Sequence, residues 1–408
     1  MKSASCPRHP LALAVALALL ASGVHAATIT VSDQGDDGNA TTCTLRQAIQ
    51  SALDDGTGGN SSCLAGSGDD VIKFAPALDH ADIYLTQGEL AITGGNVSIE
   101  GSGQTIHGDD ISPVLSVKSA TFSASKLTLT HEQSSQVSRG MYADHATVTL
   151  RDTVISGNSC TLCFGAGIYL HHAASLTLID STISGNSSGK SGGGIMVYTG
   201  DNLTLVNSTV SGNSASWYGG GIYTGSDATV VNSTVTGNSA SRVAGILTSG
   251  NTLNLVQSTV TGNSASANAG LSAYYATVLA RNSIIAGNPG NGDEIFNYAL
   301  ASTISIGYSV LGAYLATSYA GNGNQFSDDP GLGPLSDNGG PTRTMAVLSG
   351  SPALGAGDPA LALGPDLTPL NFDQRGPGYP RTLSGLVDIG AFQHQGDRVF
   401  ADGLEPAP

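Results

Sequence analysis

Basic residues are scarce in this sequence. The 408 residues include 15 lysines and arginines against 31 aspartates and glutamates, which gives a formal net charge of −16. A nucleic-acid-binding domain carries a clustered basic surface, so this composition excludes nucleic acid as a partner. The acidity also disfavours bare acidic polysaccharides, because the chain would repel them.

Long apolar runs are equally scarce. The clearest one, residues 11–20, is too short to span a bilayer. It follows Lys2 and Arg8 and precedes the small-residue sequence Val24-His25-Ala26, the order typical of a secretory signal peptide. We therefore predict that residues 1–26 are removed. The mature chain then has 13 basic and 31 acidic residues, a net charge of −18, no transmembrane segment, and an extracellular or outer-cell-surface location.

Cysteines are few. Cys6 lies in the expected signal peptide, which leaves four, an even number suited to an oxidising compartment. Proximity in sequence predicts the disulfides Cys43–Cys63 and Cys160–Cys163. The spacing of the second pair also occurs in redox and metal motifs, but no βαβ pattern surrounds it, so a structural bridge is favoured.

Helical sequence is nearly absent. Only residues 45–53 form a convincing amphipathic helix, with Thr44 as its N-cap. Its apolar face comprises Leu45, Ile49, Ala52 and Leu53. An array of strands exposes unpaired edges at its open end, so we expect this helix to cover that end.

A Gly-Asn pair recurs through the middle of the chain at intervals of 25 to 28 residues. Its asparagines are Asn158, Asn186, Asn213, Asn238, Asn263 and Asn288. A short strand pattern precedes each pair, and a glycine cluster with one apolar residue follows most of them, as in Gly192-Gly193-Gly194-Ile195. A repeat of this length predicts a solenoid. Its valine, threonine and glycine content disfavours helices, so one turn of a parallel β-helix, with coils about 4.8 Å apart, fits best.

Stacked coils explain the asparagines. Each coil places the same position above its predecessor, so the Gly-Asn residues are expected to form a ladder of side-chain amides that satisfies turn backbone. A second, inward-facing column is expected from Asn207, Asn232 and Asn282, with Asp152, Asp180 and Gln257 in the other coils. The alternative hypothesis is that these asparagines bind sugar or calcium. Their repetition in every coil favours the structural role.

Two parts of the chain resemble secreted bacterial proteins. Cys43-Thr44-Leu45-Arg46-Gln47-Ala48-Ile49 resembles the Cys-Ser-Leu-Arg-Glu-Ala signature near the start of many such β-helix proteins. The coils, with Gly-Gly-Gly-Ile and an apolar residue three before Asn, are similar to right-handed pectin-lyase-type helices. They are also similar to polymorphic outer-membrane protein repeats, which prefer Phe where this chain has Ile183 or Val210.

The segment after Asn322 is rich in proline, glycine and aspartate and resembles the choice-of-anchor Q domain, which usually precedes a surface-sorting tail. The matching motifs, in order, are Asp329-Pro330-Gly331-Leu332-Gly333-Pro334-Leu335, Asn338-Gly339-Gly340-Pro341-Thr342, Gly350-Ser351-Pro352-Ala353, Asp373-Gln374-Arg375-Gly376 and Asp388-Ile389-Gly390-Ala391-Phe392. The resemblance implies association with a cell surface.

Periodicity and resemblance together imply an all-β fold, a right-handed single-stranded parallel β-helix (a pectin-lyase-like solenoid) with a short N-terminal capping helix. The expected organisation is a signal peptide (1–26), an N-terminal cap (27–80), a β-helix of roughly ten coils at about 4.8 Å each (81–322), a choice-of-anchor Q-like domain (323–394) and a tail (395–408).

The sequence offers no clear catalytic constellation. A lyase or hydrolase on this fold needs clustered or paired carboxylates, whereas acidic residues in the coils are sparse, and Asp201 and Asp227 are expected to stack in a solvated turn. His171 and His172 are adjacent, so a strand would point them in opposite directions, and a surface loop is favoured over a metal site or a base. No catalytic, cofactor-binding or metal-binding residue is therefore assigned, and no cofactor is expected.

One variable loop column suggests a binding surface. Alignment on the Gly-Asn pair stacks large residues in an otherwise small-residue turn, and Lys190, Trp217, Tyr218 and Arg242 form a possible ligand platform. Ordinary loop variation is the alternative. The leading hypothesis is a structural or adhesive rod whose loops bind carbohydrate or a cell-surface protein. The alternative hypothesis is a carbohydrate-active enzyme, a polysaccharide lyase or a glycoside hydrolase.

Overall fold

A computed structural model describes residues 26–38, 40–57, 61–109, 111–131, 138–290, 292–298, 302–312 and 319–396. Apart from Ala26, the expected signal peptide lies outside these residues, as does the tail after Gly396.

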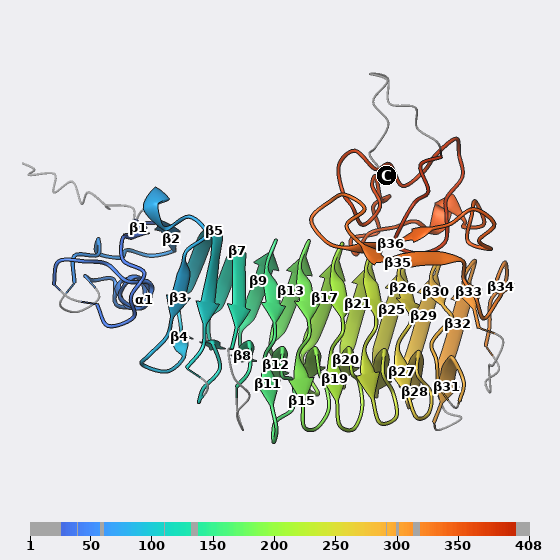
Figure 1. Ribbon diagram of the computed structural model, residues 1–408, viewed down its shortest axis with the longest axis horizontal. Coiled ribbons are helices and arrows are strands. Elements are labelled where there is room, and N and C mark those ends of the chain that lie inside the picture. The colour runs from blue at the N-terminus through green and yellow to red at the C-terminus, as the bar shows by residue number, and fades with distance from the viewer. Residues whose placement is uncertain are drawn as a thin grey trace, which may run out of the picture.

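The repeats form a right-handed parallel β-helix with three parallel sheets (Figure 1). Sheet A contains β1 (Thr28–Val31), β2 (Asp70–Phe74), β3 (Asp82–Tyr84), β5 (Asn96–His107), β7 (Thr121–Thr130), β9 (Thr147–Arg151), β10 (Val154–Ser156), β13 (Ser175–Ile179), β14 (Thr182–Ser184), β17 (Asn202–Val206), β18 (Thr209–Ser211), β21 (Asp227–Val231), β22 (Thr234–Thr236), β25 (Thr252–Val256), β26 (Thr259–Thr261), β29 (Thr277–Arg281), β30 (Ile284–Ile285), β32 (Thr303–Gly307), β33 (Val310–Leu311) and β34 (Gln325–Phe326).

The other two sheets complete each coil. Sheet B contains β4 (Leu90–Thr93), β6 (Leu115–Lys118), β8 (Met141–Asp144), β12 (Ile168–His171), β16 (Ile195–Val197), β20 (Ile222–Thr224), β24 (Ile246–Ser249), β28 (Leu271–Tyr274) and β31 (Ile295–Asn297). Sheet C contains the two-residue strands β11 (Ser159–Cys160), β15 (Ser187–Ser188), β19 (Ser214–Ala215), β23 (Ser239–Ala240) and β27 (Ser264–Ala265).

The core is a set of apolar columns inside the coils. Alternate strand residues are buried, so Leu176 in β13 stacks on Leu203, and Leu203 stacks on Ala228. Burial of such columns is the main stabilising contribution, at about 25 cal/mol for each Å² of apolar surface removed from water. The glycine clusters allow the coils to approach closely, because a Cβ atom on Gly194 would lie 2.6 Å from the carbonyl oxygen of Gly221.

The Gly-Asn asparagines form one continuous column, buried in every coil except at its last member, Asn288. Asn186 Nδ2 donates to Asn213 Oδ1 at 2.9 Å, and the same oxygen accepts from the backbone N–H of Asn186 at 3.0 Å. This pattern repeats from Asn158 to Asn288. Each preceding glycine has φ between 63° and 70°, the left-handed corner that glycine adopts without strain. The amides therefore satisfy turn backbone that would otherwise be buried and unpaired.

The second column does not face inward as expected. Asn207, Asn232 and Asn282 occupy left-handed corners between two sheet A strands, with φ between 48° and 54°. Part of the expected ladder is present, since Asn232 Nδ2 donates to Asn207 Oδ1 at 2.9 Å and Asn207 Nδ2 donates to Asp180 Oδ1 at 3.1 Å. The side chains nevertheless face outward, because Asn232 Nδ2 also donates to the Phe372 carbonyl and Asn282 Nδ2 donates to the Asp358 carbonyl. A left-handed residue breaks the alternation of an extended strand, and the sequence pattern alone did not reveal that break.

Serine takes the inward position at this corner. Ser208 is buried; its hydroxyl accepts from the N–H of Ser181 at 3.2 Å and donates to the Val206 carbonyl at 2.8 Å. The same exchange links successive coils through Ser233, Ser258, Ser283 and Ser309. This serine column follows each corner residue directly in sequence and was missed because its hydroxyls resemble ordinary turn residues.

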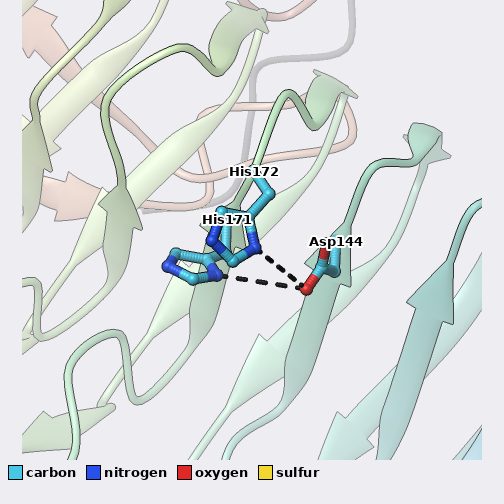
Figure 2. Close-up of side chains that lie close together, drawn as sticks. All are labelled: Asp144, His171 and His172. Carbon is cyan, nitrogen blue, oxygen red and sulfur yellow. Dashed lines mark hydrogen bonds and ion pairs between the residues drawn. The ribbon is translucent and has the colours of Figure 1, made fainter.

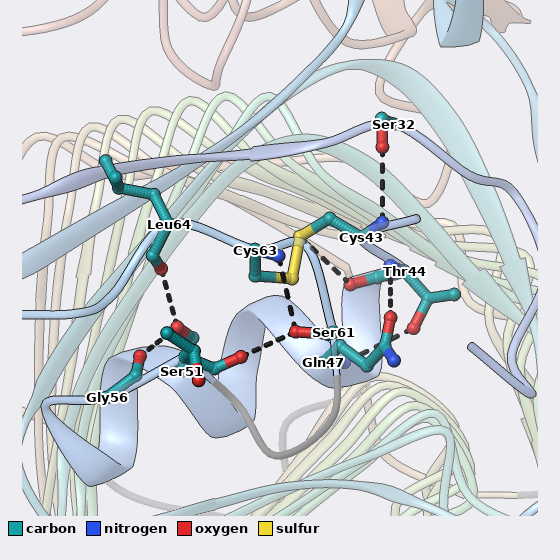
Figure 3. Close-up of a disulfide and its surroundings, with 10 residues drawn as sticks. Ser32, Cys43, Thr44, Gln47, Ser51, Gly56, Ser61, Cys63 and Leu64 are labelled. Carbon is teal, nitrogen blue, oxygen red and sulfur yellow. Dashed lines mark hydrogen bonds between the residues drawn. A yellow bond between two sulfur atoms is a disulfide. The ribbon is translucent and has the colours of Figure 1, made fainter. Parts of the chain in front are cut away.

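The N-terminal end carries the expected helix, α1 (Leu45–Asp54). Thr44 is its N-cap, and Gln47 completes a capping box by accepting from the Thr44 N–H at 3.0 Å. The helix buries Leu45 and Ile49 against the first strands, and the predicted Cys43–Cys63 disulfide joins its N-terminal end to the segment that follows the helix (Figure 3). Sheet A begins with β1 and β2, so the β-helix starts before residue 81, the boundary expected from the sequence.

Arg46 of the same motif ties the cap to the first coils. Its guanidinium pairs with Asp36 at 2.7 Å and donates to the carbonyls of Gly88 and Glu89. The Asp36 carboxylate also accepts from the N–H groups of Thr86 and Gln87. The arginine of the signature therefore has a structural role.

The C-terminal segment packs on the outer face of sheet A (Figure 1). It contains the antiparallel pair β35 (Leu332–Ser336) and β36 (Thr344–Val347) and the short helix η2 (Pro359–Leu361). The other short helix, η1 (Pro76–Leu78), connects β2 to β3 near the N-terminal end. Gln374 is buried and binds Thr209 Oγ1 at 2.8 Å and Thr234 Oγ1 at 2.6 Å. The motifs that resemble the anchor domain therefore supply much of the docking surface.

Candidate functional site

A row of aromatic side chains runs along the outer face of sheet B. Tyr142, Tyr169 and Tyr223 occupy the same register position, with Met196 between the last two. A second outward-facing position, two residues further along each strand, adds His171, Tyr198, Tyr274 and Tyr298. We call Tyr142, Tyr169, Tyr198, Tyr223, Tyr274 and Tyr298 the aromatic row. The C-terminal segment covers sheet A instead, and Tyr198, Tyr274 and Tyr298 remain 46%, 44% and 36% exposed.

Neighbouring rings of the row contact one another. The Tyr142 and Tyr169 ring centroids lie 5.8 Å apart, and His171 bridges Tyr169 to Tyr198 with centroid distances of 5.3 and 4.9 Å. Towards the C-terminal end, Tyr274 and Tyr298 are 6.2 Å apart with perpendicular rings. The rings therefore form two contacting groups, one from Tyr142 to Tyr198 and the other of Tyr274 and Tyr298, with Tyr223 in a coil between them.

The row contains a hollow of about 290 Å³. Its lining residues are Tyr218, Tyr223, Leu247, Ser249, Tyr274 and Tyr298. Burial raises the pKa of the Tyr223 hydroxyl, so it is a neutral hydrogen-bond donor at the wall of the hollow. The hollow combines apolar ring faces with hydroxyl groups, the composition of many small-ligand sites.

Cations flank the rings. The Arg139 guanidinium lies 5.4 Å from the Tyr169 centroid, and that of Arg242 lies 5.8 Å from the Tyr218 centroid. Burial lowers the pKa of Arg139, and the nearby Tyr169 and Tyr142 partly offset this change. Such contacts hold the rings in place.

The predicted platform is divided between two places. Tyr218 lines the hollow, and Arg242 Nη1 donates to the Tyr218 hydroxyl at 3.1 Å. Trp217 is 49% exposed and packs edge-on against Phe164 at 6.1 Å, while Lys190 Nζ lies 4.8 Å from the Phe164 ring. The backbone N–H of Trp217 donates to the Lys190 carbonyl, so these residues do stack in one loop column.

The aromatic row was missed from the sequence, although a signal exists. A tyrosine follows Gly-Met in Gly140-Met141-Tyr142 and Gly-Ile in Gly167-Ile168-Tyr169 and Gly221-Ile222-Tyr223. That position is the first outward-facing residue of each sheet B strand. Comparison of this position between coils identifies Tyr142, Tyr169 and Tyr223, which are half of the row.

A second cluster lies at the ends of β8 and β12, where Asp144 and His171 pair in register (Figure 2). Asp144 Oδ2 lies 3.3 Å from His172 Nδ1 and 4.0 Å from His171 Nδ1. The three ligand atoms all lie within 4.8 Å of one another. His145 Nδ1 contacts the other carboxylate oxygen, and the Tyr142 hydroxyl donates to Oδ2 at 2.8 Å.

The two histidines do not diverge, contrary to the sequence argument. His172 has φ of 52°, which ends the strand alternation immediately after His171. The two rings therefore lie on the same side, with centroids 3.5 Å apart, and both Nδ1 atoms turn towards Asp144 (Figure 2).

The cluster has a distinctive charge balance. Burial alone would raise the pKa of the Asp144 carboxyl, but hydrogen bonds from Tyr142, His145 and His172 outweigh it and lower the pKa to about 2. Burial and the neighbouring His172 lower the pKa of His171. Near neutral pH the anionic Asp144 carboxylate therefore faces a neutral His171 imidazole.

The turn carboxylates expected to stack do not align. Asp227 pairs in register with Asn202, and Asp201 lies one position earlier. Asp201 is buried and accepts from the N–H groups of Ala174 and Tyr198, whereas Asp227 is exposed and accepts from the N–H of Thr252. Both carboxylates serve backbone groups of the turns.

The predicted Cys160–Cys163 disulfide is present and closes the loop between β11 and β12. In the part of the chain that the structure describes, no helix is long and apolar enough to cross a membrane.

Comparisons with known proteins agree on the fold. Residues 78–210 match the family described as right handed beta helix region, and residues 207–225 match the Chlamydia polymorphic membrane protein repeat. The crystal structure of the pectate lyase Pel9A superposes with a TM-score of 0.55 at 10% sequence identity, covering 91% of this chain and 97% of that chain. No curated protein matches significantly. At this identity the likeness shows the fold alone, a right-handed parallel β-helix.

Proposed function

We propose that this protein is a secreted, surface-associated adhesive rod that binds neutral carbohydrate along the aromatic row. The observation that carries the proposal is the row itself, because six tyrosines share one face of sheet B and three of them are more than a third exposed. Exposed aromatic surface on this scale marks a binding face.

Carbohydrate is the ligand class that suits this surface. The C–H faces of sugar rings pack on aromatic rings, and their hydroxyl groups bind the tyrosine hydroxyls and guanidinium groups beside them. Successive sugars of an extended glycan are spaced close to the coil separation of about 4.8 Å. The net charge of −18 for the expected mature chain favours uncharged glycans.

The β-helix supports an adhesive role. Stacked coils form a rigid rod in which each coil contacts only its neighbours, and the surface loops vary while the buried columns repeat. The similarity to a membrane-protein repeat, the disulfides and the anchor-like motifs support a location outside the cell.

The test measures binding to a panel of soluble and insoluble neutral glycans by sedimentation and calorimetry. Tyr198→Ala and Tyr274→Ala should each weaken binding by about thirtyfold, equivalent to about 2 kcal/mol. The control is Tyr84→Ala, which removes an exposed tyrosine on β3 of sheet A. Unchanged binding in both row variants would refute the proposal.

The same samples are assayed for newly formed reducing ends and for unsaturated products. Sustained release would show a carbohydrate-active enzyme and replace the adhesive role. Binding without turnover is the expected result.

A further inference from the structure

We propose that Asp144, His171 and His172 form a binding site for a divalent transition metal ion such as Zn²⁺. This inference does not depend on carbohydrate binding, because it rests on the ligand atoms of Asp144, His171 and His172 and not on the exposed ring faces of the row. The cluster comes from two adjacent coils, so a bound ion would join the ends of β8 and β12.

The distances already approach a coordination geometry. Bonds of about 2.0–2.1 Å in a tetrahedral site place neighbouring ligand atoms roughly 3.3 Å apart. Asp144 Oδ2 and His172 Nδ1 are 3.3 Å apart, and His171 Nδ1 lies 4.0 Å from the same oxygen. Binding would require the His171 ring to move closer to the other two ligand atoms, which all lie within 4.8 Å of one another.

One ligand atom lacks a partner. His171 Nδ1 is shielded from solvent and makes no hydrogen bond. A buried polar atom without a partner requires a physical explanation. A metal ion between the two imidazoles and the carboxylate would supply the missing partner.

Neighbouring groups orient the carboxylate. His145 contacts Asp144 Oδ1, whereas the two ligand histidines face Oδ2, and Tyr142 donates to Oδ2. Hydrogen bonds of this kind hold metal-binding carboxylates in place and strengthen binding. His145 and Tyr142 are therefore positioning residues, while Asp144, His171 and His172 supply the ligand atoms.

The ligand set selects the class of ion. Two imidazole nitrogens and one carboxylate oxygen suit Zn²⁺, Cu²⁺, Ni²⁺ or Fe²⁺, whereas Ca²⁺ and Mg²⁺ require several oxygens. Lys118 lies beside Asp144 on the preceding strand, and its ammonium group pairs with Glu89 at 3.3 Å. Three protein ligands leave one position open, and the His172 side chain, 52% exposed, places it next to solvent.

The experiment titrates Zn²⁺ into untagged, EDTA-dialysed protein by calorimetry. Wild type should bind one equivalent of Zn²⁺, and excess Ca²⁺ should not compete. His172→Ala and Asp144→Asn should each weaken binding by more than about tenfold, since even the loss of a supporting partner costs roughly 10- to 100-fold. His145→Ala should weaken it within that smaller range while keeping the stoichiometry.

The matched control is His107→Ala. His107 also pairs with an aspartate, Asp82, at 3.1 Å, but among the described residues this pair belongs to no group of three possible metal ligands. This variant should bind Zn²⁺ like wild type. The exposed His172 is the main test because its replacement should not disturb folding, which thermal unfolding without zinc verifies. Absence of saturable binding in wild type, or wild-type affinity in both His172→Ala and Asp144→Asn, would overturn the proposal.

Discussion

Glu294 closes the asparagine column by accepting two hydrogen bonds from Asn288. Its carboxylate oxygens lie 2.9 Å from the backbone nitrogen and 2.7 Å from Nδ2 of that residue. Within the column, each side-chain oxygen accepts hydrogen bonds from the backbone N–H and from Nδ2 of the neighbouring asparagine. Glu294 therefore takes the place of the next asparagine. At the other end, His131 Nδ1 contacts Asn158 Oδ1 at 2.9 Å. A titratable side chain therefore lies at each end of the column, Glu294 at one and His131 at the other.

Glu294 should make stability depend on pH. Burial raises the pKa of its carboxyl, and the hydrogen bonds from Asn288 only partly oppose this. The folded state then binds the proton more tightly than the unfolded state, so stability falls as the pH rises from about 4.3 through the raised pKa. In chemical denaturation, the free energy of unfolding of wild type should fall relative to that of Glu294→Gln as the pH rises through this range. The exposed Glu100→Gln is the control, and parallel pH profiles for wild type and Glu294→Gln would contradict the assignment.

An interior member of the column should be costly to replace. Asn213→Leu removes the acceptor of the Asn186 N–H and the donor to the Ile183 carbonyl. Leaving such buried groups unpaired should cost about 1 to 3 kcal/mol in the free energy of unfolding. Asn202→Leu, at an exposed position of β17, is the control. Equal melting temperatures for the two variants would exclude this role for the asparagine column.

The C-terminal segment should loosen when its docking glutamine is removed. Gln374→Ala deletes the bonds to Thr209 and Thr234, which are 165 and 140 residues away in sequence. The buried Thr234 hydroxyl loses its acceptor, at a cost of about 1 to 3 kcal/mol, whereas the Thr209 hydroxyl still donates to the Arg343 carbonyl. Limited proteolysis should then cleave the segment after residue 322 faster, whereas Gln325→Ala, at an exposed position, should not change the rate. Equal cleavage rates in wild type and Gln374→Ala would argue against docking through this residue.

Trp217 borders the proposed binding face through Tyr218. Trp217→Ala should leave the fold intact, because other coils fill this turn with Lys190 or Ala267. If the loop takes part in glycan recognition, affinity should fall by up to about thirtyfold. Calorimetry against the glycan found with wild type measures the change, with unfolding curves as the folding control. Affinity within twofold of wild type would restrict the binding face to sheet B.

The sequence determined the features that depend on local chemistry. A regular Gly-Asn pair with β-branched neighbours admits only a short coil, and stacking those coils aligns Asn186 with Asn213. Thr44 specifies the start of helix α1 as its N-cap, and short separations along the chain predicted both disulfides. These inferences succeeded because periodicity and capping act over a few residues, and the repeat carries them from coil to coil.

Tertiary structure decided which way side chains face at the corners and what covers them. A left-handed residue turns Asn232 outward and brings His172 to the same side as His171, and strand alternation cannot predict either outcome. The contact of Gln374 with Thr209 joins surfaces far apart in sequence, so no local pattern encodes it. The aromatic row exists for the same reason: six coils contribute one tyrosine each, and only the register of stacked strands places them on one face.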